Sequence, residues 1–203
     1  MNKATKNFYE MAYDKMDGIQ LNWTSGTASP ELVKMVYNGK IIPNSKVLEL
    51  GCGLGAESIF LAARGMRVTA IDLAQSAINT AKKIADCYGV TVNWMVGDIL
   101  ELNDMEEQFD VITDQGCFHH MEPEERLIYL DKVNHLLRPG GLLLLRCFSD
   151  KMPAGEQPKR ISSDILIDTF HNDFVLEDMQ LVLSFSNNKY DKPLGWSTVW
   201  VKR

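Results

Sequence analysis

The chain has 203 residues, the length of one domain, and its 45% hydrophobic and 24% charged residues are usual for a folded globular protein. Its net charge of −6 argues against nucleic acid and anionic membranes as partners, because proteins that neutralise phosphates carry a basic surface. No apolar signal-peptide run and no C-x-x-C pair is present, so we expect one cytoplasmic domain over residues 1–203 without a zinc knuckle or a disulfide scaffold.

The first 40 residues precede the first strand pattern. Ser29, Pro30 and Glu31 are typical of a helix start, because they supply an N-cap, a proline at the first helical position and an acid in the first turn. This helix is expected to end near residues 38–39, which are Asn and Gly. The polar residues ahead of it are compatible with another helix.

Short apolar runs alternate with helical patterns from residue 46 onward. The predicted strands are 46–50, 66–71, 90–96, 109–113 and 141–148, and the predicted helices are 56–64, 76–88 and 123–137. Strands separated by helices form a parallel sheet with helices on both faces. The pattern therefore predicts a doubly wound, Rossmann-like α/β domain.

The last 50 residues break this alternation. A helix is predicted over 162–170, followed by two consecutive strands over 174–185 and 196–202. Two strands in succession predict an antiparallel C-terminal hairpin, which would complete a mostly parallel, seven-stranded sheet. Residues 150–160 form a loop with Pro and Gly, and a lid and a plain surface excursion are both compatible with it.

The stretch VLELGCGLGAES, residues 47–58, holds the strongest motif. Gly51, Gly53 and Gly55 permit a sharp turn and the close approach of a ligand, and the following helix offers free N–H groups. These glycines also fit a dinucleotide fingerprint, and a bare strand-to-helix turn is a further alternative. Glu49 favours a cationic ligand, because a carboxylate beside a pyrophosphate is repelled.

Acidic residues also end the next two predicted strands. Asp72 follows Gly51 by about 20 residues, where a carboxylate can accept hydrogen bonds from ribose hydroxyls in either class of nucleotide cofactor. Gly97, Asp98 and Ile99 end the third strand. A solvated strand end and an ordinary Gly-Asp turn are the alternatives at these two positions.

The exit of the fourth strand, residues 114–120, is expected to line the mouth of the site, because parallel-sheet enzymes bind ligands outside the carboxyl ends of their strands. His119 and His120 are candidates for a substrate contact or a base, since histidine titrates near neutral pH. The alternative is that they only form the turn before the helix that Pro123 starts. A metal pair is not expected, because adjacent side chains diverge and no third ligand is evident.

The spacing of Glu49, the three glycines, Asp72 and Asp98 resembles the motifs of class I S-adenosylmethionine-dependent methyltransferases. Residues 22–30, with Trp, Gly and Pro ahead of a helix, and residues 116–119 resemble the branch that contains thiopurine, thiol, halide and tellurite methyltransferases. The resemblance covers residues 20–150, and it implies transfer of a methyl group from S-adenosylmethionine to a small-molecule acceptor such as a thiol. Methyltransferases that act on amino groups of nucleic-acid bases carry an Asn/Asp-Pro-Pro-Tyr stretch, which this chain lacks.

The resemblance also implies the residues of the site. The N-terminal segment, residues 1–40, would cover the cofactor, and Trp23 would either face its cationic end or simply pack on the sheet. The residues implied to hold the cofactor are Trp23, Glu49, Gly51, Cys52, Gly53, Gly55, Asp72, Leu73, Asp98, Ile99, Asp114 and Gln115. Those on the acceptor side are His119, His120, Arg146 and Phe148.

Three alternatives stay open at this stage. Arg146 would either attract an anionic acceptor or lie in water at the end of the fifth strand. A nicotinamide-dependent oxidoreductase would have the same fold, although it has no use for Glu49. A non-catalytic protein that senses S-adenosylmethionine would share the motifs.

Overall fold

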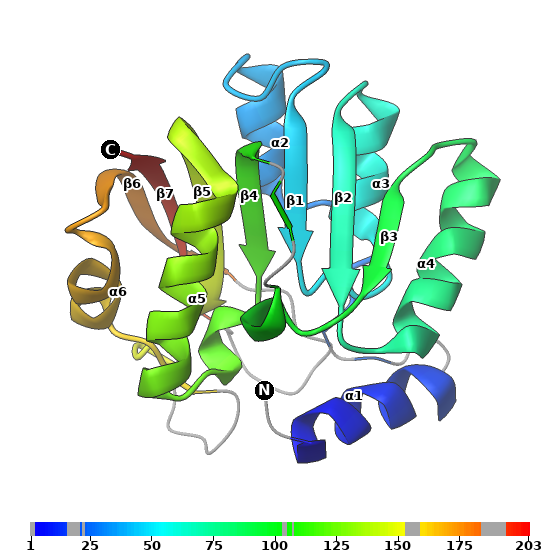
Figure 1. The fold of residues 1–203 in the computed structure, drawn as a ribbon, viewed down its shortest axis with the longest axis horizontal. Helices are drawn as coiled ribbons and strands as arrows, with labels where there is room; N and C mark the ends of the chain where they lie inside the picture. Colours follow the sequence, from blue (N-terminus) through cyan, green and yellow to red (C-terminus); the bar gives the residue numbers. More distant parts are fainter. Residues whose placement is uncertain are drawn as a thin grey trace.

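The structure, a computed structural model, describes residues 3–15, 21, 23–102, 105–106, 108–152, 159–183 and 194–203. Its centre is a seven-stranded sheet in the order β3-β2-β1-β4-β5-β7-β6, with helices on both faces (Figure 1). The strands are β1 (Lys46–Leu50), β2 (Arg67–Asp72), β3 (Asn93–Val96), β4 (Phe109–Gln115), β5 (Leu137–Phe148), β6 (Phe174–Leu183) and β7 (Leu194–Lys202). Strands β1 to β5 are parallel, and β7 is antiparallel to both of its neighbours.

Six α-helices and two short 3₁₀ helices are described around this sheet. The α-helices are α1 (Lys3–Lys15), α2 (Pro30–Tyr37), α3 (Ala56–Ala63), α4 (Gln75–Tyr88), α5 (Pro123–Leu136) and α6 (Ser163–Phe170), and the 3₁₀ helices are η2 (Ile99–Glu101) and η3 (Phe118–His120). The Ser29 side chain accepts a hydrogen bond from the backbone N–H of Leu32, so α2 begins with the predicted N-cap and proline.

Two hydrophobic cores lie on opposite faces of the sheet. The first core contains Leu48 and Leu50 of β1 together with residues of α5 and α6. The second core contains Val47 of β1 together with residues of α2, α3 and α4. The alternation of side chains along each strand therefore assigns α5 and α6 to one face and α2, α3 and α4 to the other.

The sequence predictions of a doubly wound sheet and a C-terminal antiparallel hairpin are confirmed. The predicted start of the fifth strand at residue 141 is wrong, because Leu137 is fully buried and already pairs with Phe109 before a bulge. The third strand begins at Asn93 rather than at residue 90. The proposed lid loop at 150–160 lies largely outside the described residues, since 153–158 are not among them.

The strands β1 to β5 end together at one edge of the sheet, which we call the carboxyl edge. Helix α1 lies at this edge, close to the start of α4 (Figure 1). The arrangement brings the ends of five strands together with an N-terminal helix and so determines where the site is built. None of the helices that the structure describes is long and apolar enough to cross a membrane.

Candidate active site

The glycine turn after β1 has a backbone that only glycine adopts without strain. Gly51, Gly53 and Gly55 have φ values of 68°, 53° and 77°, in the left-handed region. A Cβ at Gly53 would lie 2.8 Å from the hydroxyl oxygen of Tyr13, and a Cβ at Gly55 would overlap the ring of Trp94. The space that side chains would need at Gly53 and Gly55 is taken by Tyr13 and Trp94, so glycine lets the turn pack closely against α1 and β3.

Asp72 fastens this turn to the end of β2. Its Oδ2 accepts a hydrogen bond from the N–H of Gly53 at 2.8 Å, and its Oδ1 accepts one from the N–H of Ala74 at 2.9 Å. Burial raises the pKa of Asp72, and the charge of Glu10 adds to this effect. Each carboxylate oxygen has a second lone pair, so the geometry remains compatible with ribose hydroxyls as donors.

The ends of β1, β2 and β3 hold the other residues implied to contact the cofactor. Asp98 begins η2, because its Oδ1 accepts a hydrogen bond from the N–H of Leu100 at 2.9 Å. Ile99 and Cys52 are buried, whereas Leu73 is half-buried. The predicted acids therefore lie at neighbouring strand ends of one edge.

Glu49 lies on the face of the sheet that α3 covers, and its carboxyl group accepts a hydrogen bond from the hydroxyl of Ser58. Nearby, Oε1 of Glu57 accepts hydrogen bonds from the hydroxyl and the N–H of Ser29 at 2.6 and 3.2 Å. Burial raises the pKa of Glu49 and the pKa of Glu57, and for Glu49 the charge of Glu57 is the second cause. A cation near this pair would favour the ionised carboxylates.

Asp114 builds the turn that leaves β4. Its Oδ1 accepts from the N–H of Cys117 at 2.7 Å, and its Oδ2 accepts from the N–H of Phe118 and the hydroxyl of Tyr129 at 3.1 and 2.9 Å. Burial raises its pKa to about 6 despite these three hydrogen bonds. These hydrogen bonds show that Asp114 stabilises the turn that contains His119 and His120.

His119 is buried, and the lone pair of its Nδ1 already accepts a hydrogen bond. Its Nδ1 accepts a hydrogen bond from the N–H of Phe148 at 3.0 Å, and the two rings lie 4.8 Å apart. Burial, followed by the charge of His120, lowers the pKa of His119 well below its ordinary value. A neutral imidazole with its acceptor nitrogen engaged holds the β5 exit in place, and it is poorly suited to abstract a proton.

His120 forms a pair with Tyr9 of α1. Its Nε2 lies 2.8 Å from the Tyr9 hydroxyl. Burial lowers the pKa of His120 to about 4 and raises the pKa of Tyr9. Both groups are therefore neutral near pH 7, and the tautomer of His120 decides which of them donates the hydrogen bond.

Helix α1 contributes residues that the sequence analysis missed. The side chain of Glu10 accepts from the N–H of Ser76 at 3.1 Å, and the hydroxyl of Tyr13 accepts from Nε1 of Trp23 at 2.9 Å. The rings of Tyr9 and Trp23 lie 5.7 Å apart. The helical spacing of Tyr9 and Tyr13 was the available signal, because residues four positions apart share one face of a helix.

Arg146 lies beside Gln115 in the β4–β5 register. Its Nη1 is 3.4 Å from Oε2 of Glu31, and its Nη2 donates to the carbonyl oxygen of Leu183 at 3.4 Å. Its side chain is 14% exposed. Arg146 is thus half-buried beside a carboxylate, unlike the edge residue in water that was one of the alternatives.

The fold and the site together define a class of protein. A glycine turn after β1 and acids at the ends of β2 and β3 are typical of doubly wound domains that bind a nucleoside-containing cofactor. Among the residues that the structure describes, no group of three or more His, Cys, Asp or Glu is arranged to hold a metal ion.

Comparison with known proteins specifies the family. Residues 47–141 match the family described as "Methyltransferase domain". An uncharacterized methyltransferase of Schizosaccharomyces pombe is 30% identical over 118 residues, which cover 58% of this chain and 80% of that protein. The chain therefore belongs to the class I S-adenosylmethionine-dependent methyltransferases, and S-adenosylmethionine is its cofactor.

Other relatives differ in the acceptor that their names give. The 2-heptyl-1-hydroxyquinolin-4(1H)-one methyltransferase of Mycobacteroides abscessus is 29% identical, over 81% of this chain and 73% of that protein. The probable thiol methyltransferase 2 of Arabidopsis thaliana is 26% identical, over 69% and 62%. The structure of 1,6-didemethyltoxoflavin-N1-methyltransferase from Burkholderia thailandensis, with bound 1,6-didemethyltoxoflavin and S-adenosylhomocysteine, has a TM-score of 0.78 and 25% identity, over 98% of this chain and 87% of that chain.

Proposed function

We propose that this methyltransferase acts on a small molecule whose nucleophile is soft, with a thiol as the first acceptor to test. The observation that carries the proposal is the state of the two histidines at the mouth of the site. His119 is buried and His120 is half-buried, both are already hydrogen-bonded, and their lowered pKa values make them weak bases at neutral pH. A thiol, with an ordinary pKa of about 8.5, ionises in part without such help.

When bound, S-adenosylmethionine would supply an electrophilic methyl group, which would pass to the thiolate while the electron pair of the broken carbon–sulfur bond stays on the sulfur of the cofactor. The residues of the chain would bind the cofactor and the acceptor and align their reacting atoms. The glycine turn and Asp72 would hold the nucleoside end of the cofactor, and Asp98 would face its adenine ring. The thiol proton goes to water before transfer, and alignment of the reacting atoms at roughly 3–3.5 Å supplies much of the rate.

Two features support a small acceptor over a macromolecular one. Helix α1 contacts the glycine turn, the β4 exit and the start of α4, and so it restricts access to the carboxyl edge. The net charge of −6 disfavours nucleic acid or an anionic membrane as the partner. The thiol methyltransferase among the relatives is compatible with the proposed nucleophile.

The test combines calorimetry with product detection. Micromolar binding of S-adenosylmethionine is expected, and Asp72→Ala should weaken it by roughly 1–3 kcal/mol, because two buried N–H groups lose their acceptor as well. Mass spectrometry should detect the methylated product in a panel of thiols, selenite, tellurite, halide and an N-hydroxyquinolone. Tight cofactor binding with a product only from the quinolone would reject the soft nucleophile, and no product at all would favour a sensor. Binding of NAD alone would reject the cofactor assignment.

A further inference from the structure

A layer of polar side chains lies between the carboxyl edge of the sheet and helices α2 and α3. Val47 of β1, Val111 of β4 and Leu144 of β5 belong to the second core and face these helices. Side chains at even spacing further along each strand lie on the same face of the sheet. The β-sheet register places Glu49 beside Thr113 and Gln115 beside Arg146. We call this group the polar layer, and it consists of Glu31, Glu49, Glu57, Thr113, Gln115 and Arg146.

Three oxygen atoms of the polar layer are buried and have no hydrogen-bond partner among the described residues. They are Oε2 of Glu31, Oγ1 of Thr113 and Oε1 of Gln115. Thr113 is only 2% exposed, and its hydroxyl oxygen is buried. Buried polar groups in folded proteins are nearly always hydrogen-bonded, and these oxygens therefore indicate a place where a ligand supplies donors.

The charges in the polar layer favour a cation. The layer holds three carboxyl groups, of which burial raises the pKa of Glu49 and that of Glu57, and a single guanidinium group that interacts with Glu31 and Glu57. Nη1 of Arg146 lies 3.4 Å from Oε2 of Glu31, and the charge of Arg146 lowers the pKa of Glu57 against the larger effect of burial. An anionic group entering the layer would be repelled by the carboxylate of Glu31, whereas a cationic group would be attracted to it and would favour the ionised form of Glu57.

We propose that the polar layer binds an ammonium group carried by the methyl acceptor, with Oε2 of Glu31 and Oε1 of Gln115 accepting its N–H donors. An ammonium group has three donors and no acceptor, which matches the three buried oxygens that accept no hydrogen bond. The inference rests on the proposed function and adds a specificity to it. Aminothiols are preferred over thiols that carry a hydroxyl or a carboxylate at the same distance.

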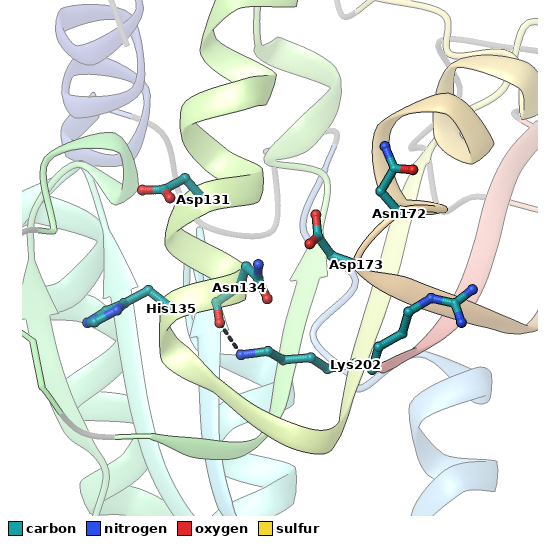
Figure 2. Close-up of a pocket in the computed structure, with 7 residues that line it drawn as sticks. Asp131, Asn134, His135, Asn172, Asp173 and Lys202 are labelled. Atoms are coloured by element: carbon teal, nitrogen blue, oxygen red, sulfur yellow. Dashed lines mark hydrogen bonds between the residues drawn. The ribbon is translucent and has the colours of Figure 1, made fainter.

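A pocket at the opposite edge of the sheet contains a carboxylate, Asp131, whose replacement serves as the control for changes in the polar layer. Figure 2 shows this open pocket of about 480 Å³, formed by the end of α5, the start of β6 and the end of β7. Lys202 donates hydrogen bonds to the carbonyl oxygens of Asn134 and Leu137, and so it closes the end of α5. Asp131, on the exposed rim, allows a carboxylate to be removed far from the polar layer.

The experiment compares cysteamine, 2-mercaptoethanol and 3-mercaptopropionate at saturating S-adenosylmethionine, with rates expressed per thiolate ion. The expected order of kcat/KM is cysteamine, then 2-mercaptoethanol, then 3-mercaptopropionate. Glu31→Gln should reduce the preference for cysteamine over 3-mercaptopropionate by about tenfold or more, because the attraction and the repulsion both weaken. Gln115→Met should act in the same direction, whereas Asp131→Asn should leave the preference unchanged.

A second measurement does not depend on turnover. Propylamine and propionate, which have no thiol, are titrated calorimetrically into the complex with S-adenosylhomocysteine. Binding of propylamine that Glu31→Gln weakens supports the polar layer as an ammonium site, even where no thiol is methylated and the proposed nucleophile is rejected. Equal rates for the three thiols, or no difference between propylamine and propionate, would overturn the inference. Loss of S-adenosylmethionine affinity in Glu31→Gln with an unchanged thiol preference would overturn it too, because the layer would then serve the cofactor.

Discussion

Gly55 and Gly89 form a matched pair of left-handed glycines, with φ values of 77° and 65°. A Cβ at Gly89 would meet no atom within 4 Å, whereas a Cβ at Gly55 would overlap the ring of Trp94. Gly89→Ala should therefore lower the free energy of unfolding by about 1 kcal/mol, the cost of the backbone conformation alone. Gly55→Ala should lower it by about 3 kcal/mol, because overpacking adds to that cost.

Urea denaturation of the two variants measures the difference. Equal losses of stability would mean that the ring of Trp94 moves aside without cost, and that the glycine serves only the backbone turn. A larger loss of stability for Gly55→Ala would show that Gly55 also permits the close packing of the glycine turn against β3.

The sequence predicted the positions of the site acids better than their partners. Glu49, Asp72 and Asp98 lie at neighbouring strand ends as expected, because the alternation of strands and helices brings those ends to one edge. The hydrogen bonds that His119 accepts from Phe148 and that Asp114 accepts from Tyr129 were not predictable. They depend on Phe148 and Tyr129, which come from other elements and lie 29 and 15 positions away along the chain.

At the scale of elements, α1 is the part of the site that sequence reasoning described least. Its contacts with the β4 exit join residues 111 positions apart, and no local pattern specifies such pairs. The α2 start and the β1 strand were predicted well, because a helix cap and an apolar run are local signals. The β5 start was mispredicted because Pro139 and Gly140, typical of a loop, lie within its bulge.

The Tyr9 hydroxyl should help to keep α1 closed over the site. Tyr9→Phe removes its hydrogen bond to His120, so the free energy of opening should fall by about 1 kcal/mol. Amide exchange in α1 should then be about fivefold faster, and S-adenosylmethionine should dissociate faster by a similar factor. The contacts of Glu10 with Ser76 remain, so α1 stays docked on average.

Hydrogen-exchange mass spectrometry and stopped-flow dissociation test this role. Tyr88→Phe is the control, because Tyr88 is 69% exposed on α4, away from α1. Unchanged exchange in α1 for Tyr9→Phe would show that the Tyr9–His120 hydrogen bond does not contribute to closure.

At the scale of the molecule, the sheet order explains why polar groups gather at one edge. Parallel strands end together, so the side chains that follow them form one site, and helices on both faces bury it. Burial then shifts the pKa values of several ionisable groups there. It raises the pKa values of Glu49, Glu57, Asp72 and Asp114, and it lowers those of His119 and His120.

These shifts make the stability of the whole molecule depend on pH, and His120 gives the clearest test. Its pKa is about 4 in the folded protein, against an ordinary value of 6.5. A base with a lowered folded pKa binds fewer protons when folded, so its effect is to reduce stability as the pH falls from about 6.5 towards 4. The buried acids act oppositely in the same range, so the wild-type profile alone does not isolate His120.

The comparison of wild type with His120→Asn isolates it. Between pH 7.5 and pH 5, protonation of His120 in the unfolded state should lower the free energy of unfolding of the wild type by roughly 1–2 kcal/mol. The variant lacks this histidine and should not show this loss. The variant should therefore be less stable than the wild type at pH 7.5, because the Tyr9 hydroxyl loses its hydrogen bond to the imidazole, and the difference in stability should narrow or reverse at pH 5. Urea denaturation at the two pH values measures the gap. A gap that stays constant would mean that His120 titrates alike in the folded and unfolded chains, and would reopen its assignment as a base.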